Sequence, residues 1–295
     1  MQIVGYEPRR PRSNPPPADD DPAVDAEDGL DSSSRSPLSD ATLLVSGPSG
    51  GKGESTGDAG EVTRISLEPG TRLEYGLETR RCAGTLTADG HQPCDRPAAP
   101  YCQYHTSTWV CARCTGTCLK DEMDCYEAHA IYLAAFGPDT FKVGVTRRWR
   151  LETRLREQGA DRGAHIATVP DGRIAREREA DLAATDGLVD RVRTRAKVRS
   201  LAESVDEAGW AALLERTDVD VRSQVAFEYG LDLETRPVRE TLATGTVIGA
   251  KGRLLVLERG GTTYAVDMRD LVGYELEERG DGQRRQRQSS LGAFS

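Results

Sequence analysis

Residues 82–125 read Cys82-AGTLTADGHQP-Cys94-DRPAAPY-Cys102-QY-His105-TSTWV-Cys111-AR-Cys114-TGT-Cys118-LKDEMD-Cys125 and contain all seven cysteines of the chain. Tetrahedral zinc takes pairs of ligands from tight turns, and Cys102-x2-His105 and Cys111-x2-Cys114 have the spacing of such turns. Seven thiols and one imidazole make eight ligands, the number that two zinc sites need. We therefore expect a cysteine-rich module that holds two zinc ions.

The partition of these ligands between two sites is open at the level of sequence, because His91 or His129 can replace a thiolate. A structural role is favoured over a catalytic one, since four protein ligands leave no position for water. The opposing interpretation is a set of disulfides or free core cysteines. The chain opens without a secretory leader, which favours a reducing cytoplasm in which disulfides are rare.

Composition places the chain in the class of soluble globular proteins. Its formal charge is −9, and only five of its 39 basic residues are lysines. This preference for arginine, together with many carboxylates, suggests the high-salt cytoplasm of a halophilic archaeon. Overall acidity then does not exclude nucleic acid as a partner. No apolar run approaches the ~20 residues that cross a membrane, so we expect no membrane partner.

Local charge differs from the overall charge between residues 140 and 200. This segment has thirteen arginines and two lysines against nine acidic residues, a formal excess of +6. A basic block of this kind is typical of a surface that contacts phosphates. The alternative is ordinary i,i+4 pairing on solvated helices, for example between Glu152 and Arg156.

Hydrophobic patterning predicts an α+β chain with six segments. We expect N-terminal strands in 1–79 with disordered acidic insertions at about 7–40 and 47–60, a zinc module at 80–128, an α/β domain at 129–186, a helical segment at 187–236, a β meander at 237–279 and a disordered tail at 280–295. The N-terminal strands and the C-terminal meander are expected to share one small barrel or sheet.

Two local arrangements are specific enough to be checked. Strands at 62–67 and 71–77 are expected to form a hairpin around Pro69-Gly70. The α/β domain is expected to follow the order strand, strand, helix, strand, helix, at 130–136, 141–145, 151–158, 165–169 and 173–185.

Several short motifs resemble one family. They are Cys82-x-Gly84, Tyr101-Cys-x-x-His105, His129-x-x-Tyr132-Leu-Ala, Lys142-Val-Gly-Val-Thr146 and Glu157-Gln-Gly-Ala160. With these motifs the chain resembles the family catalogued as domain of unknown function 2797. The resemblance covers most of the chain outside the insertions and the tail, and it implies no particular activity.

A more distant resemblance concerns chemistry. Ala130-Ile-Tyr132, Lys142-Val-Gly144, Arg154 and Glu179 follow one another as do the motifs of the GIY-YIG nuclease domain, a three-stranded sheet flanked by helices. The resemblance implies that Tyr132 helps to deprotonate water, Arg154 contacts phosphate and Glu179 holds Mg²⁺ or Mn²⁺. The chain departs from the motif at Ala130 and at Lys142, which stands where the family has a tyrosine.

These departures leave the candidate catalytic set as Tyr132, Lys142, Arg154 and Glu179, with Arg150 and Glu177 as rivals for the last two positions. Three functions are compatible with this set. The preferred one is a zinc-binding, nucleic-acid-binding protein that uses Lys142, Arg147, Arg148, Arg150 and Arg154 to contact DNA or RNA phosphates. The alternatives are an active metal-dependent endonuclease and a non-catalytic scaffold for a protein partner.

Overall fold

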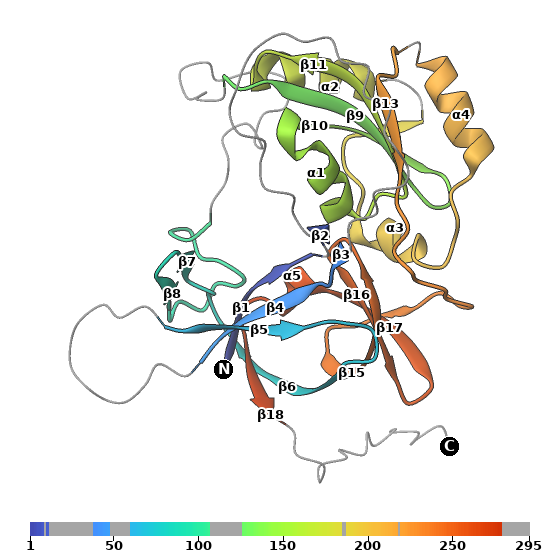
Figure 1. Ribbon diagram of the computed structural model, residues 1–295. Coiled ribbons are helices and arrows are strands. Elements are labelled where there is room, and N and C mark those ends of the chain that lie inside the picture. Colours follow the sequence, from blue (N-terminus) through green and yellow to red (C-terminus); the bar gives the residue numbers. More distant parts are fainter. Residues whose placement is uncertain are drawn as a thin grey trace, which may run out of the picture.

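The computed structural model describes residues 1–8, 10–11, 38–47, 60–106, 126–184, 187–217 and 219–278. The chain has the expected α+β composition and contains a nine-stranded sheet, a five-stranded sheet and two small two-stranded sheets (Figure 1). Within the described part of the chain, no helix has both the length and the apolar character needed to cross a bilayer.

The nine-stranded sheet combines the two ends of the described chain. Its strands lie in the order β14 (Val238–Arg239), β17 (Thr262–Asp267), β16 (Leu254–Arg259), β15 (Ala243–Lys251), β6 (Arg72–Arg80), β18 (Tyr274–Glu278), β1 (Gln2–Glu7), β4 (Thr42–Ser46) and β5 (Val62–Ser66). β1 pairs antiparallel with β18 and with β4. The expected association of N-terminal strands with the C-terminal meander is therefore present.

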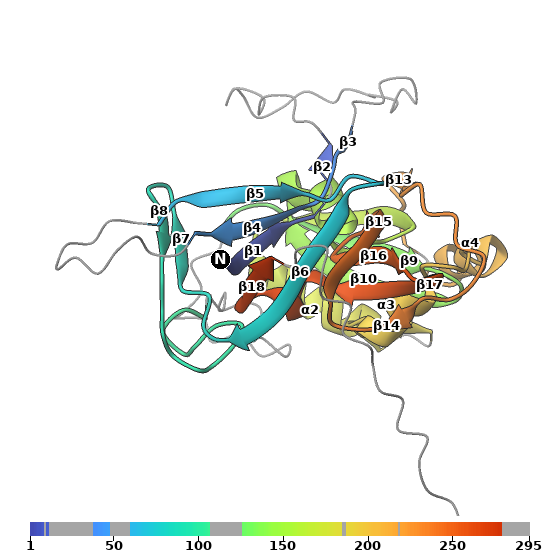
Figure 2. The same ribbon diagram turned by 90° about the horizontal axis from the view of Figure 1, so that it is seen from below.

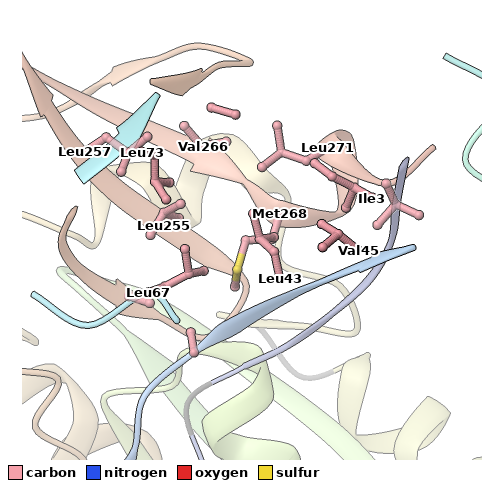
Figure 3. Packing of buried hydrophobic residues seen from close by; sticks show 14 of the residues in the cluster. Ile3, Leu43, Val45, Leu67, Leu73, Leu255, Leu257, Val266, Met268 and Leu271 are labelled. Atoms are coloured by element: carbon pink, nitrogen blue, oxygen red, sulfur yellow. The ribbon is translucent and has the colours of Figure 1, made fainter. Parts of the chain in front are cut away.

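The buried face of this sheet encloses one hydrophobic core. Ile3 of β1, Leu43 of β4 and Val266 of β17 are each fully buried in the same cluster. Figure 3 shows side chains of β1 and β4 converging on those of β16, β17 and the short helix α5 (Met268–Leu271). Strands far apart in the sheet order thus share a core, which requires the sheet to curve around it.

The prediction of a hairpin around Pro69-Gly70 is wrong. The turn is present, with Gly70 at φ 91°, but β5 and β6 are separated in the sheet by β4, β1 and β18 (Figure 2). β6 pairs with β15 and β18 instead. Leu67, before the turn, and Leu73, after it, are both buried in the core. The turn therefore leads from β5 into a strand that does not pair with β5.

Short strands also lie at the edges of the predicted insertions. β2 (Arg10–Pro11) pairs with β3 (Leu38–Ser39), inside the segment expected to be disordered. Residues 9 and 12–37 of that segment, residues 48–59 of the second insertion and the tail after Glu278 lie outside the described residues. β7 (Thr85–Thr87) pairs with β8 (Gly90–Gln92) in the cysteine-rich region.

The five-stranded sheet has the order β12 (Leu188–Val189), β10 (Thr140–Arg147), β9 (His129–Phe136), β11 (Arg162–Val169) and β13 (Ser223–Ala226). The predicted order of strands and helices is confirmed, with η3 (Arg148–Arg150) leading into α1 (Leu151–Gln158) and α2 (Gly172–Ala183) following β11. The sheet is larger than the three strands expected, because β12 and β13 come from the segment predicted as helical. That segment also forms α3 (Thr194–Arg199) and α4 (Glu207–Arg216).

The helices cover both faces of the five-stranded sheet. Leu155 of α1 packs with Tyr132 and Phe136 on one face, while Ala175 of α2 and Trp210 of α4 pack on the other. Figure 1 shows α1 between the two large sheets.

A buried ion pair joins the two sheets. The Lys251 ammonium at the end of β15 lies 2.7 Å from a carboxylate oxygen of Asp161, at the start of β11. This contact helps to fix the two units against each other.

Candidate functional site

Four predicted zinc ligands meet in one cluster. The ligand atoms of Cys82, Cys94, Cys102 and His105 all lie within 4.8 Å of one another. Cys82 follows β6, Cys94 follows β8, and a turn joins Cys102 to His105 through a 2.9 Å backbone hydrogen bond. The sulfur atoms of Cys82 and Cys102 each lie 3.3 Å from His105 Nδ1. Three thiols and one imidazole from separate turns within residues 82–105 are thus gathered in one place.

The surroundings of the cluster suit a bound metal ion. The backbone N–H groups of Gly84 and Cys102 donate to the Cys82 sulfur at 3.4 and 3.2 Å. Such donors stabilise a thiolate, which is the form of cysteine that binds a metal. Three sulfurs and one nitrogen form a donor set that fits a tetrahedral metal ion.

The other predicted ligands do not enter this cluster. Cys111, Cys114, Cys118 and Cys125 lie outside the described residues. His91 is buried, but its Nε2 lies 2.8 Å from the Ala83 carbonyl, and burial lowers its pKa. His129 is buried on β9 with Nδ1 2.7 Å from the Glu127 carbonyl. In this cluster, therefore, neither His91 nor His129 takes the place of a thiol.

A second site is a pocket between the two large sheets. Its volume is about 1110 Å³, and Tyr132 of β9, Lys142 of β10, Arg154 of α1 and Glu179 of α2 all line it. The four residues of the predicted catalytic set are therefore brought to one place. The rivals Arg150 and Glu177 are absent from its described lining and pair with Glu157 and Arg173, at 2.9 and 3.0 Å.

The lining of the pocket is strongly cationic. Seven basic side chains stand against the three carboxylates of Glu157, Glu179 and Asp190, a formal excess of four positive charges among the described residues. The basic residues are Lys142, Arg154, Arg176, Arg191, Lys197, Arg253 and Arg269.

The nine-stranded sheet supplies part of this wall. Tyr6 comes from β1, Arg253 from the turn between β15 and β16, and Arg269 from α5. Sequence reasoning missed these residues, and also Lys197 of α3 as a site residue. The basic block at 140–200 was a signal for Lys197, but no local motif marks Tyr6, Arg253 or Arg269. The pocket is thus composite, and its far wall depends on the association of the two units.

Tyr132 lies at the closed side of the pocket. Its side chain is buried, and its hydroxyl accepts a hydrogen bond from Gln158 Nε2. Burial raises the pKa of the Tyr132 phenol, although the charge of Arg154 acts in the opposite direction. The Tyr132 phenol thus keeps its proton near pH 7 while its oxygen accepts the hydrogen bond from Gln158.

Glu179 is held in place by its neighbours. It is buried and forms an ion pair with Arg176 one turn earlier on α2. Lys142 Nζ donates to the carbonyls of Val143, at 2.8 Å, and Asp190. Burial lowers the pKa of Lys142 to about 8, an effect partly offset by the Glu179 carboxylate. Glu179 thus contributes charge compensation inside a cationic pocket.

Two of the five basic residues predicted to contact nucleic acid, Lys142 and Arg154, line the pocket. Arg150 and Arg154 both pair with Glu157, at 2.9 and 3.4 Å, and Arg147 pairs with Glu127 at 3.3 Å. Arg148 is also absent from the described lining. Part of the basic block forms the i,i+4 ion pairs that were the alternative expectation, since Arg156 pairs with Glu152 at 2.8 Å. The cationic surface is formed by the pocket rather than by the sequence-local cluster.

Comparison with known proteins gives one match. A family model described as a protein of unknown function, DUF2797, matches residues 91–276. This range includes three ligands of the cysteine cluster and every basic residue of the pocket. No curated protein and no solved structure matches the chain.

Proposed function

This chain belongs to the DUF2797 family, proteins of unknown function, and from the geometry of its pocket we propose that it is a zinc-binding protein that binds the phosphates of a nucleic acid. The observation that carries this proposal is the formal excess of four positive charges, with both lysines counted as protonated, in a pocket of about 1110 Å³. The chain as a whole has a formal charge of −9, so the charge of the pocket is opposite in sign to that of the whole protein. A concave surface of one sign focuses its field on ligands of the opposite sign.

The size and chemistry of the lining support a phosphate chain over a single small anion. Typical small-molecule pockets measure roughly 300–1,000 Å³, so this one has room for more than one phosphate group. Five of its seven cations are the exposed or partly buried arginines Arg154, Arg176, Arg191, Arg253 and Arg269. Guanidinium groups bind phosphate oxygens in bidentate fashion. Phosphate contacts of this kind bind many sequences with similar affinity.

The Cys82, Cys94, Cys102 and His105 cluster supports the zinc part of the proposal. Its four ligands complete a tetrahedral site and leave no position for substrate, which indicates a structural metal. The cluster and the pocket share no residue. We assign zinc to the stability of the cysteine-rich segment and phosphate binding to the pocket.

The test is fluorescence anisotropy with labelled single-stranded, double-stranded and branched DNA and with RNA, at stepwise KCl concentrations. We expect the zinc-loaded protein to bind, and the double variant Arg191→Ala/Arg269→Ala to bind every sequence more weakly. Arg259→Ala is the matched control, because Arg259 is an exposed arginine of β16 outside the pocket lining. Failure of the wild type to bind any oligonucleotide at low salt would refute the proposal, as would equal affinity of the pocket variant.

A second candidate, endonuclease activity, is favoured by the convergence of Tyr132, Arg154 and Glu179 on the pocket. Catalysis with Mg²⁺ or Mn²⁺ would require Glu179 to exchange its Arg176 partner for the metal ion. A cleavage assay separates the two candidates. An endonuclease loses activity in Glu179→Gln and keeps it in Glu177→Gln, whose carboxylate lies on the same helix outside the pocket lining. A phosphate-binding protein cleaves nothing in either form.

A further inference from the structure

Lysine is rare in this chain, and its placement is selective. Arginine supplies all but five of the 39 basic residues. Three of the five lysines, Lys142, Lys197 and Lys251, lie in the described part of the chain, and none of them is exposed. Arginine stays protonated in proteins, whereas a buried lysine can lose its proton and act as a nucleophile. Positions where this arginine-rich chain keeps lysine are therefore candidates for amine chemistry.

Lys251 shows the purely structural case. Its ammonium lies 2.7 Å from an Asp161 carboxylate oxygen and also donates to the Ser200 carbonyl at 2.7 Å. It does not line the cationic pocket. Burial lowers the pKa of Lys251 as well, but the paired Asp161 carboxylate acts in the opposite direction and favours the ammonium form.

Lys197 has different surroundings. It lines the pocket from α3, donates to the Gln158 carbonyl at 2.6 Å and lies 5.2 Å from the centre of the Phe136 ring. Its hydrogen-bond acceptor is thus a neutral carbonyl, and an aromatic face covers one side.

The charges that act on Lys197 are mostly of its own sign. Arg253, Arg154 and Lys142 disfavour its protonated form, and Asp267 acts in the opposite direction. Burial is the largest effect, and together these surroundings lower the pKa of Lys197 to about 7. Desolvation and neighbouring cations are the two means by which lysine nucleophiles are activated.

We propose that Lys197 is a nucleophile that forms a Schiff base with the carbonyl group of a phosphate-bearing ligand held in this pocket. The inference rests on the phosphate-binding part of the proposed function. Two sources share this ligand chemistry: the aldehyde of an abasic site in a nucleic acid, and a small phosphorylated aldehyde or ketone. Both present an electrophilic carbon at a short distance from a phosphate.

The step is balanced and needs no oxidant or reductant. The neutral Lys197 amine attacks the carbonyl carbon, a C–N bond forms, and the carbonyl electron pair moves to oxygen. A proton passes from nitrogen to that oxygen to give a carbinolamine. Protonation of the hydroxyl then releases water as the nitrogen lone pair forms the C=N bond. Burial and the cationic neighbours favour the unprotonated amine at the start, and the pocket cations hold the ligand phosphate throughout.

Borohydride trapping on the full-length, zinc-loaded protein tests the inference. The protein is incubated at pH 8 with pyridoxal 5′-phosphate, which carries both an aldehyde and a phosphate, and with pyridoxal, which lacks the phosphate. Borohydride reduces any imine to a stable amine, and peptide mapping by mass spectrometry locates the adduct. A lysine with a pKa of about 7 is mostly neutral at pH 8, whereas an ordinary lysine is neutral to less than about 1%.

We expect the adduct on Lys197 to form at least about tenfold faster than on Lys52 or Lys120, and inorganic phosphate to slow it. Lys197→Arg, which keeps the charge and removes the nucleophile, is expected to lose the adduct. The zinc content and melting temperature of Lys197→Arg show whether this variant folds. Peptide mapping of the wild-type protein locates the adduct even if the variant does not fold. Matched reactions with an abasic-site oligonucleotide and with glyceraldehyde 3-phosphate then distinguish the two ligand sources.

Three results would overturn the inference: an adduct confined to other lysines, no adduct at all, or equal labelling of Lys197 by pyridoxal and its phosphate. Oligonucleotide binding is measured on the same preparation. Binding without an adduct refutes the role of Lys197 and leaves the proposed function standing. An adduct with the phosphorylated aldehyde in a protein that binds no oligonucleotide supports Lys197 and refutes the nucleic-acid proposal.

Discussion

Gly144 lies directly opposite Tyr132 in the antiparallel ladder of β9 and β10, and a Cβ atom at Gly144 would lie 2.5 Å from both Cζ and the hydroxyl oxygen of Tyr132. The phenol ring therefore extends over the glycine backbone, and its hydroxyl meets Gln158 at the pocket. Any side chain at position 144 would occupy the space of the ring. The glycine of Lys142-Val-Gly144 and the tyrosine of Ala130-Ile-Tyr132 thus form a single packing unit.

Gly144→Ala is expected to lower the free energy of unfolding by about 1–3 kcal/mol, because the new methyl group forces the buried ring to move. Urea denaturation followed by circular dichroism measures the change. Gly47→Ala is the matched control, since a Cβ atom there meets nothing within 4 Å. Equal stability of the two variants would show that Tyr132 does not need the space over Gly144.

Local patterns were sufficient to predict the centre of the five-stranded sheet. The continuous apolar run at 130–136, the shorter strand pattern at 141–145 and Gly159 after the helical pattern reflect short-range physics, and the structure places β9, β10 and α1 there. Trp210 and Leu213, three residues apart on α4, both pack in the core of this unit. Asp206 caps α4, because its carboxylate accepts a hydrogen bond from the Gly209 N–H.

Contacts between residues far apart in sequence were not predictable in the same way. The turn at Pro69-Gly70 suggested a hairpin, yet β6 pairs with β15 and β18 instead of β5, and Leu67 and Leu73 meet only as members of one core. Arg253 and Arg269 reach the pocket only because the last strands fold beside the first. The sequence marked the basic block near Arg154 but not the wall that completes it.

Cys102→Ser is expected to remove one zinc ion per chain and lower the melting temperature, because metal-binding energy in such modules is folding energy. Atomic emission on the purified protein measures zinc content. Cys114→Ser tests the four cysteines that follow. If the two zinc sites are independent, each single variant loses one zinc ion and the double variant Cys102→Ser/Cys114→Ser loses both. If the sites share ligands, either single variant loses both zinc ions. Unchanged zinc content in Cys102→Ser would remove Cys102 from the ligand set.

Phosphate contacts in the pocket have a salt signature. The logarithm of the binding constant falls with the logarithm of salt concentration by about 0.7 per contacted phosphate on single strands and about 0.9 on duplex DNA. Arg269→Ala is therefore expected to reduce the slope by roughly one such unit for every sequence tested. Anisotropy titrations over a range of KCl concentrations give the slope, and Arg259→Ala should reproduce the wild-type value. A pocket variant with an unchanged slope would place the phosphate elsewhere.

Asp161→Asn is expected to destabilise the fold by about 3 kcal/mol, because it leaves the buried Lys251 ammonium without its carboxylate partner. Asp139→Asn, which breaks the exposed pair with Arg199, should cost about 0–1 kcal/mol. Urea denaturation compares both with the wild type. Adding Lys251→Met to Asp161→Asn should recover part of the loss, since the unpaired charge is then gone. A loss no larger than that of Asp139→Asn would mean that the pair does not join the units.

The lowered pKa of Lys197 also predicts how stability depends on pH. Burial and the charge of Arg253 bring the pKa of Lys197 to about 7 in the folded protein, against an ordinary value of 10.5 in the unfolded chain. Between these values the unfolded state binds more protons than the folded state, so the contribution of Lys197 to stability rises with pH. Below pH 7 both states bind the proton, and the penalty for burying the charge is complete.

Lys197→Met removes this titration. We expect the stability of the wild type relative to the variant to increase steadily from about pH 7 to pH 10, as measured by urea midpoints at fixed ionic strength. Comparing the two proteins at each pH cancels the titration of all other groups that respond equally in both. A stability difference between the two proteins that stays constant from pH 7 to pH 10 would show that Lys197 keeps an ordinary pKa. The argument that Lys197 is an activated nucleophile would then lose this support.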